Sequence, residues 1–513
     1  TRGNKRWERK KAAAFHGGGA SEGRPPRHGK RRGGGAPGLG LHGPATGKER
    51  ERTPAAPHHP MCNRFVFLFA FCLAPLVAAE SAVALRLGVG RADITPGTDV
   101  RNWVTGKAYG AVLDPLAVQV LTLDDGVTKA AVVRWDLTDV SESARDEVRR
   151  VIETATGIPG GNILVNASHT HSAPWSPVYR DGYRGRERDN WWALRYMPAQ
   201  NDHPPFRAWM QRLLDASVEA TKAALAAACP ASMSIGRVSV AEYLYNRRPR
   251  APAWGLAEPK AVRTMAASSP DWNAAVLTGG STFGPMDRTL SLLWLRAEDG
   301  KNLATLYHTS VHSVSIYPSN PGISADWPGP ASAAIAGAFG GEALFLQGTC
   351  GDITPWRRGP QAVAEMAEAF VKKAREAEKF AVRLAPRAIR TARATIDLPL
   401  TPAARERTGT HSVAAEVQVI VCGPLAFVAL PGEPLTDLGT AIREQSPFPQ
   451  TLVLGYSNGM GVHYVGMPGE KARGGYEAGV AGAGTDECGR LLVEAAVRLL
   501  RETYSTPGYP GKS

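Results

Sequence analysis

Two hydrophobic patterns alternate along most of the chain. Short continuous apolar runs, at residues 130–135 and 290–295, are typical of strands buried within a sheet. Longer stretches with apolar residues three or four positions apart are typical of amphipathic helices. We expect such helices at residues 140–156, 206–228, 361–378 and 485–504. This mixture predicts an α/β fold with a mixed β-sheet core flanked by helices.

The first 79 residues differ in composition from the rest. Residues 1–60 are rich in Gly, Pro, Arg and Lys and have no hydrophobic period, so we expect a disordered leader upstream of a native start at Met61. Residues 61–79 begin with a short basic segment, continue with a twelve-residue apolar run and end in small residues. This pattern is typical of a secretory signal peptide, which predicts a secreted or periplasmic protein.

The positive charge of the chain lies mostly in this leader. The whole sequence has a net charge of +13, and residues 1–60 hold fourteen Lys or Arg against four Glu. The part from Met61 onward is therefore close to neutral, which argues against a nucleic-acid partner. No apolar run reaches the roughly 20 residues that a transmembrane helix needs. Charge and hydropathy thus exclude two broad classes of function.

The cysteines give no metal motif. Two of the six lie within the signal peptide, and the other four show no Cys-x-x-Cys spacing, so a cysteine zinc site is not expected. An exported chain permits disulfides, and both disulfide pairing and four buried thiols stay open. The four residues are Cys229, Cys350, Cys422 and Cys488.

Two histidines placed two residues apart are the strongest chemical signal in the chain. His169 and His171 follow the apolar run at residues 162–165, and Pro174 ends the segment. In a strand, side chains at i and i+2 point to the same face, so both imidazoles should reach one space. A strand end that opens into a loop is a common place for a metal or catalytic site. The alternative is a pair of histidines satisfied by neighbouring backbone.

Further candidates stand where other apolar runs end. His312 follows a run at residues 303–308, and Glu433 follows an apolar run and a Pro-Gly turn. Neutral imidazole is the usual zinc ligand, and a catalytic zinc needs about three protein ligands and an open position. His169 and His312 could supply two of them, and a carboxylate such as Glu433 is a suitable type, although a surface turn glutamate is the alternative. Taken alone, Tyr464 and Tyr476 do not indicate a functional site.

Taken in order, short segments of the chain resemble the neutral, or non-lysosomal, ceramidase family of zinc amidohydrolases. The likeness runs from about residue 88 to residue 477, and the order of the segments makes coincidence a poor explanation. The segments are Ala-Asp-Ile-Thr-Pro at 92–96, Asp-Pro-Leu at 114–116, His-Thr-His-Ser at 169–172, Asn-Arg-Arg at 246–248, Gly-Pro-Met-Asp at 284–287, Ser-Ala-Asp-Trp-Pro-Gly at 324–329 and Gln-Gly-Thr-Cys-Gly-Asp-Ile-Thr-Pro at 347–355.

The resemblance implies one zinc ion per chain and its ligands. The implied ligands are His169, His312, Glu433 and Tyr464. The second histidine of the pair, His171, would lie behind these ligands or against the substrate. Zinc lowers the pKa of a bound water to about 7 and polarises a carbonyl that approaches it, which suits hydrolysis of an amide.

Five residues are candidates for the remaining chemistry. His171 is the candidate for proton transfer, since an unperturbed histidine titrates near pH 6.5. Arg247 and Tyr476 match active-site positions of the family and are candidates for holding the oxyanion or the substrate. Asp326 and Asp352 could orient a zinc-bound imidazole through its far nitrogen, and could equally cap a helix or a turn.

Two segments bear on the substrate. Residues 351–355 resemble the substrate-facing loop of the family, with Thr354 where the family often has serine. The segment between His171 and Pro205 is too polar for core and too aromatic for a linker, so we expect a substrate rim or lid, with a packed surface loop as the alternative. Its aromatic residues are Trp175, Trp191, Trp192 and Tyr196.

The resemblance therefore predicts that residues 80–513 form a zinc hydrolase domain that cleaves the amide of an N-acyl lipid such as ceramide. The expected partner is a small-molecule or lipid substrate, with any membrane contact peripheral. Full-length family members continue into an immunoglobulin-like β-sandwich, whereas about 36 residues follow Glu477 here. A zinc amidase or esterase acting on another acylated substrate stays open for this reason. A non-catalytic binding protein with the same fold is a further alternative, in which we would expect a ligand residue to be lost.

Overall fold

A computed structural model describes residues 85–103, 105–179, 202–248, 284–317, 320–385 and 387–505. These residues belong to one unit of the chain, Ala78–Ser513. The predicted leader at 1–60 and signal peptide at 61–79 lie outside the described residues, as do the aromatic residues at positions 191, 192 and 196.

The larger of two main sheets has nine strands. Eight of them follow the order β4-β3-β2-β1-β5-β7-β8-β9, and β11 pairs with β5. Neighbours are antiparallel except for β3–β4 and β8–β9, which are parallel. The strands are β1 Arg86–Asp93, β2 Ala117–Asp124, β3 Lys129–Trp135, β4 Ile163–Ala167, β5 Cys229–Ser239, β7 Thr289–Ala297, β8 Asn302–Thr309, β9 Glu342–Gln347 and β11 Val382–Leu384.

The second main sheet has four strands in the order β12-β13-β14-β16, and only its last pair is parallel. Two short two-stranded ladders, β6–β10 and β15–β17, stand apart from both sheets. The bounds are β12 Ile389–Pro399, β13 Ser412–Cys422, β14 Leu425–Ala429, β16 Gln450–Leu454, β6 Leu244–Asn246, β10 Ile353–Pro355, β15 Glu433–Pro434 and β17 Tyr464–Val465.

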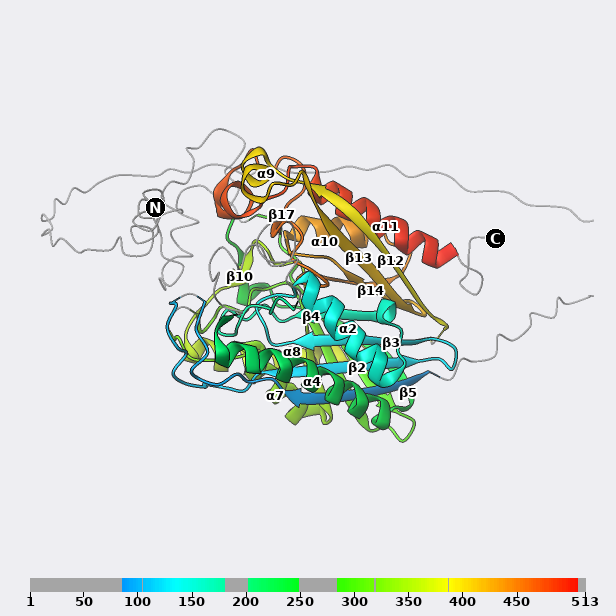
Figure 1. Ribbon diagram of the computed structural model, residues 1–513. Helices are drawn as coiled ribbons and strands as arrows, with labels where there is room; N and C mark the ends of the chain where they lie inside the picture. Colours follow the sequence, from blue (N-terminus) through cyan, green and yellow to red (C-terminus); the bar gives the residue numbers. More distant parts are fainter. Residues whose placement is uncertain are drawn as a thin grey trace, which may run out of the picture. The chain divides into compact units, whose positions relative to one another are not determined.

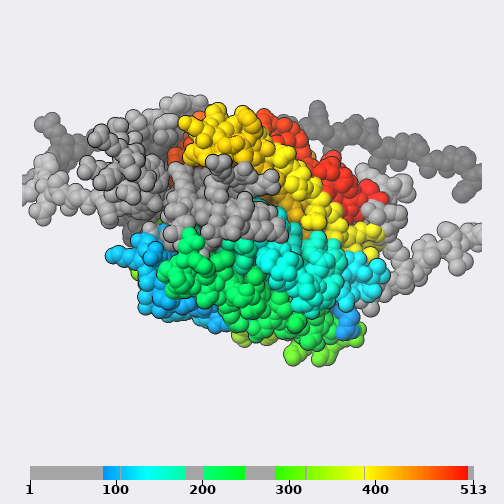
Figure 2. Space-filling view, viewed as in Figure 1, coloured from blue at the N-terminus to red at the C-terminus, as the bar shows by residue number. Residues whose placement is uncertain are grey.

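Helices cover the outer face of each sheet (Figure 1). The α-helices are α2 Glu142–Thr156, α4 Pro204–Ala227, α7 Pro328–Phe339, α8 Pro360–Glu378, α9 Pro402–Thr408, α10 Thr436–Gln445 and α11 Cys488–Ser505. Short helical turns occur at Gly160–Asn162 and Ala241–Tyr243, and a π-helix spans Tyr476–Ala481. The space-filling view shows α4 in green and the cyan segment around α2 below the yellow and red segments that hold β12 and α11 (Figure 2).

Strand alternation divides the interior into three apolar clusters. In β3, Ala131 and Val133 face the cluster beneath α2, α4, α7 and α8, whereas Ala130 and Val132 face the second sheet. In β14, Phe427 faces the first sheet and Val428 faces the cluster beneath α10 and α11. Because side chains alternate along a strand, each sheet has two buried faces. The result is four layers in the order helices, sheet, sheet, helices.

The predicted α/β class with helices flanking a mixed sheet is confirmed. Each of the four expected helices is present within three residues of its expected start, as α2, α4, α8 and α11. Within the described part of the chain, all four cysteines are free thiols, and three of them are buried whereas Cys229 is half-buried. The alternative of four buried thiols is therefore met for three of the four. No helix among the described residues is long and apolar enough to cross a membrane.

Candidate metal and hydrolase site

The two histidines of the His-x-His segment meet, but strand alternation is not the reason. β4 ends at Ala167, and His169 has a left-handed backbone with φ of 62°. The expectation that both side chains share one face of a strand was therefore wrong, because the chain leaves the strand before His169. Their Nε2 atoms nevertheless lie 3.1 Å apart. A left-handed non-glycine residue costs about 1–2 kcal/mol, and such strain often collects at functional sites.

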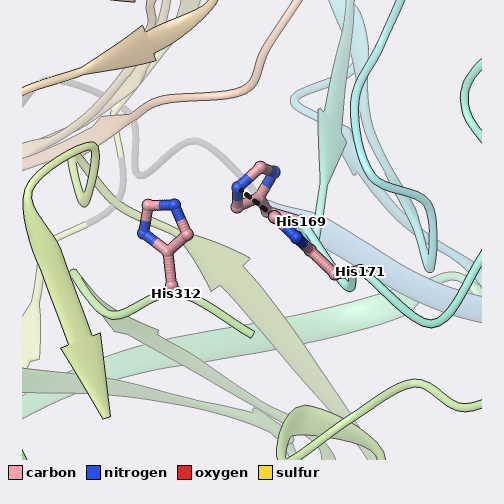
Figure 3. Close-up of side chains that lie close together, drawn as sticks. All are labelled: His169, His171 and His312. Carbon is pink, nitrogen blue, oxygen red and sulfur yellow. Dashed lines mark hydrogen bonds between the residues drawn. The ribbon is translucent and has the colours of Figure 1, made fainter. Parts of the chain in front are cut away.

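A third imidazole completes the cluster. His312 follows β8. Each of His169, His171 and His312 offers one ring nitrogen, and these three nitrogens lie within 4.8 Å of one another. Figure 3 shows the three rings turned toward a common space. His169 and His312 are buried. Their arrangement gives three nitrogen donors of the kind that hold a transition-metal ion.

Backbone carbonyls fix which nitrogen of each buried ring faces the cluster. The Nδ1 of His169 lies 2.6 Å from the carbonyl oxygen of Thr138, and the Nδ1 of His312 lies 2.6 Å from that of Cys350. A carbonyl oxygen only accepts, so each Nδ1 carries the proton and each Nε2 presents a lone pair. Burial, and then Arg247, lower the pKa of His312 to about 3, so this ring is neutral at pH 7. A neutral ring with an inward Nε2 lone pair, as in His312, is the form that a metal requires.

Glu433 brings a carboxylate to the same point. Its Oε2 lies 3.3 Å from the Nε2 atoms of both His169 and His312, and its Oε1 lies 2.8 Å from the Nε2 of His463. Burial alone would raise the pKa of Glu433, but His169 and His463 help to hold it well below its usual range. The carboxylate is therefore ionised at neutral pH and can serve as an oxygen ligand.

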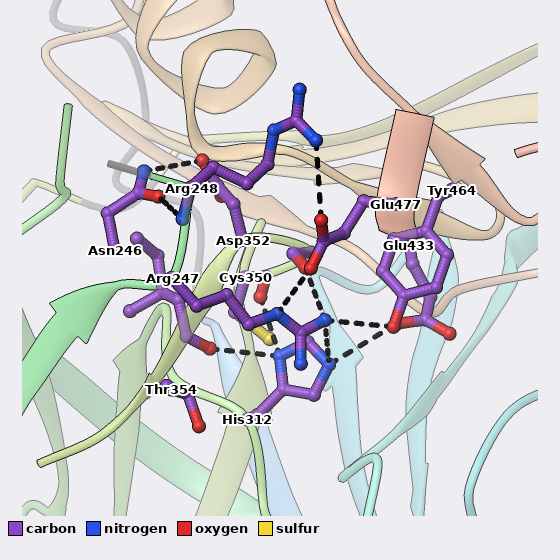
Figure 4. A network of polar contacts seen from close by, with 12 residues as sticks. Asn246, Arg247, Arg248, His312, Cys350, Asp352, Thr354, Glu433, Tyr464 and Glu477 are labelled. Carbon is purple, nitrogen blue, oxygen red and sulfur yellow. Dashed lines mark hydrogen bonds and ion pairs between the residues drawn. The ribbon is translucent and has the colours of Figure 1, made fainter. Parts of the chain in front are cut away.

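Arg247 stands between His312 and Tyr464. One guanidinium nitrogen, Nη2, lies 3.3 Å from the Nε2 of His312 and donates to the Tyr464 hydroxyl at 2.9 Å. Its Nε lies 2.7 Å from Glu477 Oε1 (Figure 4). All four sequence-predicted ligands thus meet in one place, with Tyr464 linked to the imidazoles through Arg247. The His312 lone pair that accepts from Arg247 is the one that a metal would use, so the two contacts exclude each other.

Comparison with known proteins identifies the fold. No protein-family model matches the chain, and no curated protein matches it. Among solved structures, neutral ceramidase from Pseudomonas aeruginosa superposes with a TM-score of 0.62 at 17% identity, covering 84% of this chain and 76% of that one. The chain has the fold of a neutral ceramidase. A structure described as ceramidase complexed with C2 also matches with a TM-score of 0.62, at 16% identity and over 84% of this chain and 77% of that one.

Tyr476 lies at the open side of the site in this ceramidase fold. It is the first residue of the π-helix, and 51% of its side-chain and backbone surface is exposed. Its ring lies 5.8 Å from that of Tyr464, in an edge-to-face arrangement. Because Tyr464 is buried and Tyr476 is exposed, the two hydroxyls have different surroundings.

The two aspartates support loops, which matches the turn-capping alternative. Asp326 accepts from the backbone nitrogens of Ser315 and Ile316 at 2.7 and 2.9 Å. Asp352 accepts from Asn246 Nδ2 at 2.6 Å. The expectation that they orient the imidazoles of the cluster is corrected, because backbone carbonyls contact the Nδ1 atoms of both His169 and His312.

Several residues of the site were missed from the sequence. Tyr456 stacks on His169 with ring centroids 4.0 Å apart, and its hydroxyl lies 3.4 Å from Glu433 Oε2. His463 contacts the same carboxylate, and its left-handed φ of 66° is unusual for a residue with a side chain. The Thr354 hydroxyl is buried and accepts from Arg358, so it is engaged in the loop itself.

An aromatic wall surrounds His171. The rings of Trp103 and Tyr317 lie 5.3 and 5.1 Å from its imidazole, and Trp103 also contacts Trp175 in an edge-to-face arrangement at 5.3 Å. Trp175 is buried, so the first part of the predicted rim is packed against the protein. The wall makes the surroundings of the histidine cluster apolar on the side of His171.

Proposed function

We propose that the protein is a zinc-dependent hydrolase that cleaves the amide bond of an N-acyl lipid such as ceramide, releasing a fatty acid and an amine. The observation that carries the proposal is the convergence of two fixed Nε2 lone pairs with the Glu433 carboxylate. The ceramidase fold supports the choice of reaction. The assignment of residues 61–79 as an export signal and of residues 80–513 as the catalytic domain rests on the sequence.

The donor set fits zinc. We assign His169, His312, Glu433 and Tyr464 as the ligands, since two imidazoles, a carboxylate and a phenol oxygen are nitrogen and oxygen donors that zinc accepts. His171 adds a third imidazole within the same cluster. Bound zinc would supply Lewis acidity and a water acidified to a pKa of about 7.

The other residues have distinct tasks in this proposal. Burial, followed by the neighbours His169 and His312, lowers the pKa of His171 well below its usual range, so His171 is neutral and is a weaker base than a free histidine. Its proposed role in proton transfer rests on its place in the histidine cluster and not on a matched pKa. Arg247 carries a fixed positive charge, anchored by Glu477, toward the place where an amide oxygen would become negative. Tyr476 can donate a hydrogen bond from the open side of the site. Asp326 and Asp352 act only by holding the loops of His312 and Arg247 in place.

The apolar wall favours an acylated substrate. Trp103 and Tyr317 present aromatic rings beside His171, where an acyl chain next to the scissile amide can be buried. Burial of such a chain stabilises binding by about 25 cal/mol per Å² of apolar surface. A polar acyl donor would gain little from this wall.

A hydrolysis screen tests the proposal. Ceramides, N-acyl amino acids and simple acyl esters should be incubated with the purified chain, with and without a chelator, and metal content measured. Zinc near one ion per chain and chelator-sensitive release of fatty acid from ceramide are expected. The His312→Ala variant should lose metal and activity, whereas His411→Ala, which removes an exposed imidazole elsewhere, should lose neither. Preference for an ester or another amide would change the substrate, and a metal-free protein without activity would favour a binding role.

A further inference from the structure

One face of the large sheet changes from apolar to polar at one end. On the side that packs against the second sheet, β7 and β8 present Leu293 and Leu306 to the core between the sheets. Two positions further along, the same face carries Arg237 of β5, Ser291 of β7 and His308 of β8. The strand register pairs Arg237 with Ser291 and Ser291 with His308. The three residues therefore form one polar row across three neighbouring strands.

This polar row lines a cavity of about 260 Å³. The other walls come from Asp287 and Thr289 at the approach to and start of β7, from Arg443 of α10, and from four residues just before and within β16, which are Phe448, Pro449, Thr451 and Leu452. Drug-sized ligands occupy pockets of about 300–1,000 Å³, so this cavity suits a smaller molecule. Ser291 and His308 are buried, whereas Arg237 is exposed and can be reached from solvent.

Two guanidinium groups and one carboxylate line this cavity. Arg443 Nη1 lies 2.7 Å from Asp287 Oδ2, which balances one of the two positive charges. Among the residues that the structure describes, Arg237 has neither a hydrogen-bond nor an ion-pair partner for its side chain. Although the residue as a whole is exposed, its guanidinium is partly buried, and this partial burial together with the nearby charge of Arg443 lowers the pKa of Arg237. One positive charge at the cavity is left without a counter-ion.

The remaining polar groups add hydrogen bonds without adding charge. Burial lowers the pKa of His308 to about 4, so its ring is neutral at pH 7, and its Nε2 donates to the carbonyl oxygen of Val453 at 3.1 Å. The hydroxyl of Ser291 has no side-chain hydrogen bond within the described ranges. A hydroxyl donor beside an unpaired guanidinium is a combination that recognises oxyanions.

We propose that this cavity is a binding site for a phosphate group, with Arg237 as its main charged contact and Ser291 as a hydrogen-bond donor. Arg forms two parallel hydrogen bonds to phosphate oxygens, and it is favoured wherever phosphate is recognised in this way. The site is separate from the histidine cluster and does not depend on the proposed hydrolase activity. Free phosphate and a small phosphate monoester share the chemistry that the cavity recognises.

Calorimetric titration with inorganic phosphate tests the site. The zinc-loaded full chain, the Arg237→Gln variant and an Arg383→Gln control should be titrated at constant ionic strength. Arg383 is an exposed arginine of β11, next to β5 and outside the cavity, so the control removes the same charge. One phosphate should bind to the wild type and to the control with equal affinity, and to Arg237→Gln at least about tenfold more weakly.

A second titration, with glycerol phosphate, distinguishes a site for phosphate monoesters from a site for free phosphate. Glycerol phosphate that binds more tightly than inorganic phosphate, and with the same dependence on Arg237, would assign the cavity to monoesters. The reverse order would assign it to free phosphate. Equal binding by all three proteins would place the anion elsewhere, for example at the metal, and would overturn the proposal. Absence of binding to the wild type at 10 mM phosphate, about ten times the concentration that half-saturates a millimolar site, would overturn it as well.

Discussion

Glu433 and Tyr464 are paired residues in the short parallel ladder of β15 and β17. Paired residues on neighbouring strands point to the same side, about 5 Å apart, so the ladder presents a carboxylate and a phenol oxygen together. Gly432, just before β15, has φ of 72°, and a Cβ there would meet the carbonyl oxygen of His463 at 2.4 Å. The turn that brings Glu433 into the ladder therefore requires glycine.

This pairing predicts that Tyr464→Phe weakens retention of zinc. The substitution removes the oxygen and keeps the ring, so packing should change little. Even partners outside the metal's own ligands affect its affinity by about 10–100-fold, so loss of a ligand should cost at least that much. Metal content after dialysis against a graded chelator series measures the effect. Unchanged zinc affinity would remove Tyr464 from the ligand set and leave its role as the partner of Arg247.

Tyr476→Phe should lower turnover without weakening zinc binding, in contrast to Tyr464→Phe. Tyr476 is exposed at the mouth of the site, and its hydroxyl can donate to the oxyanion as the carbonyl becomes tetrahedral. Loss of one such donor typically costs about 10²–10³-fold in kcat with little change in the ground state. Steady-state kinetics should show normal zinc content, a similar KM and a low kcat. Full activity would exclude Tyr476 from the mechanism, and loss of zinc would mean that the roles of the two tyrosines are reversed.

Much of the fold follows from local sequence patterns, and the exceptions have physical causes. The apolar runs at 130–135 and 290–295 are buried on both faces, so they appear as β3 and β7. β12 is harder to predict, because charged residues and threonines interrupt its apolar residues and leave no continuous apolar run. α7 begins Pro-Gly-Pro, which argues against a helix, although proline is tolerated in the first turn because its missing N–H has no partner there.

The candidate site could be predicted in part for the same reason. His169, His312 and Glu433 each follow an apolar run, which marks a strand end where functional side chains collect. His463 and Tyr456 contact Glu433, and both have a positive backbone φ. No local sequence pattern predicts a positive φ at residues other than glycine, so these contacts could not be predicted. The place of Arg247 between Tyr464 and His312 depends on a long-range ion pair with Glu477. Contacts of this kind become visible only in three dimensions.

Arg247→Gln should separate catalysis from metal binding. The guanidinium competes for the His312 lone pair and repels a cation, so the variant should hold zinc at least as tightly as the wild type. It should lose about 10²-fold in kcat, because the charge facing the developing oxyanion is gone. Zinc affinity and kcat measured on one preparation check both parts. Weaker zinc binding together with normal turnover would contradict the assignment.

A double variant controls for structural damage at Arg247. Removing the arginine takes one of two cations from the buried Glu477 carboxylate, and Arg248 remains 3.3 Å away. Some stability should therefore be lost in Arg247→Gln. Arg247→Gln combined with Glu477→Gln removes both charges and should regain melting temperature. If turnover recovered with stability, Arg247 would have only a structural role.

The buried imidazoles also predict how stability depends on pH in the metal-free protein. His312 has a folded-state pKa of about 3, and burial with neighbouring imidazoles lowers that of His171 well below its usual range. In the unfolded chain both should titrate near pH 6.5. Between these values the unfolded chain binds more protons, so stability is fully present above about pH 6.5 and is lost as the pH falls toward 3. The slope is at most ~1.4 kcal/mol per pH unit for each histidine.

Urea unfolding of the chelator-treated protein between pH 7.5 and 5 measures this slope. His312→Gln cannot take up the proton, so it should flatten the dependence, whereas His411→Ala, at an exposed position, should leave it unchanged. The same protons compete with zinc for the Nε2 lone pairs, so saturating zinc should shift the loss of stability to lower pH. A pH dependence that is identical in the wild type and in His312→Gln would show that the buried imidazole does not stay neutral in the folded protein.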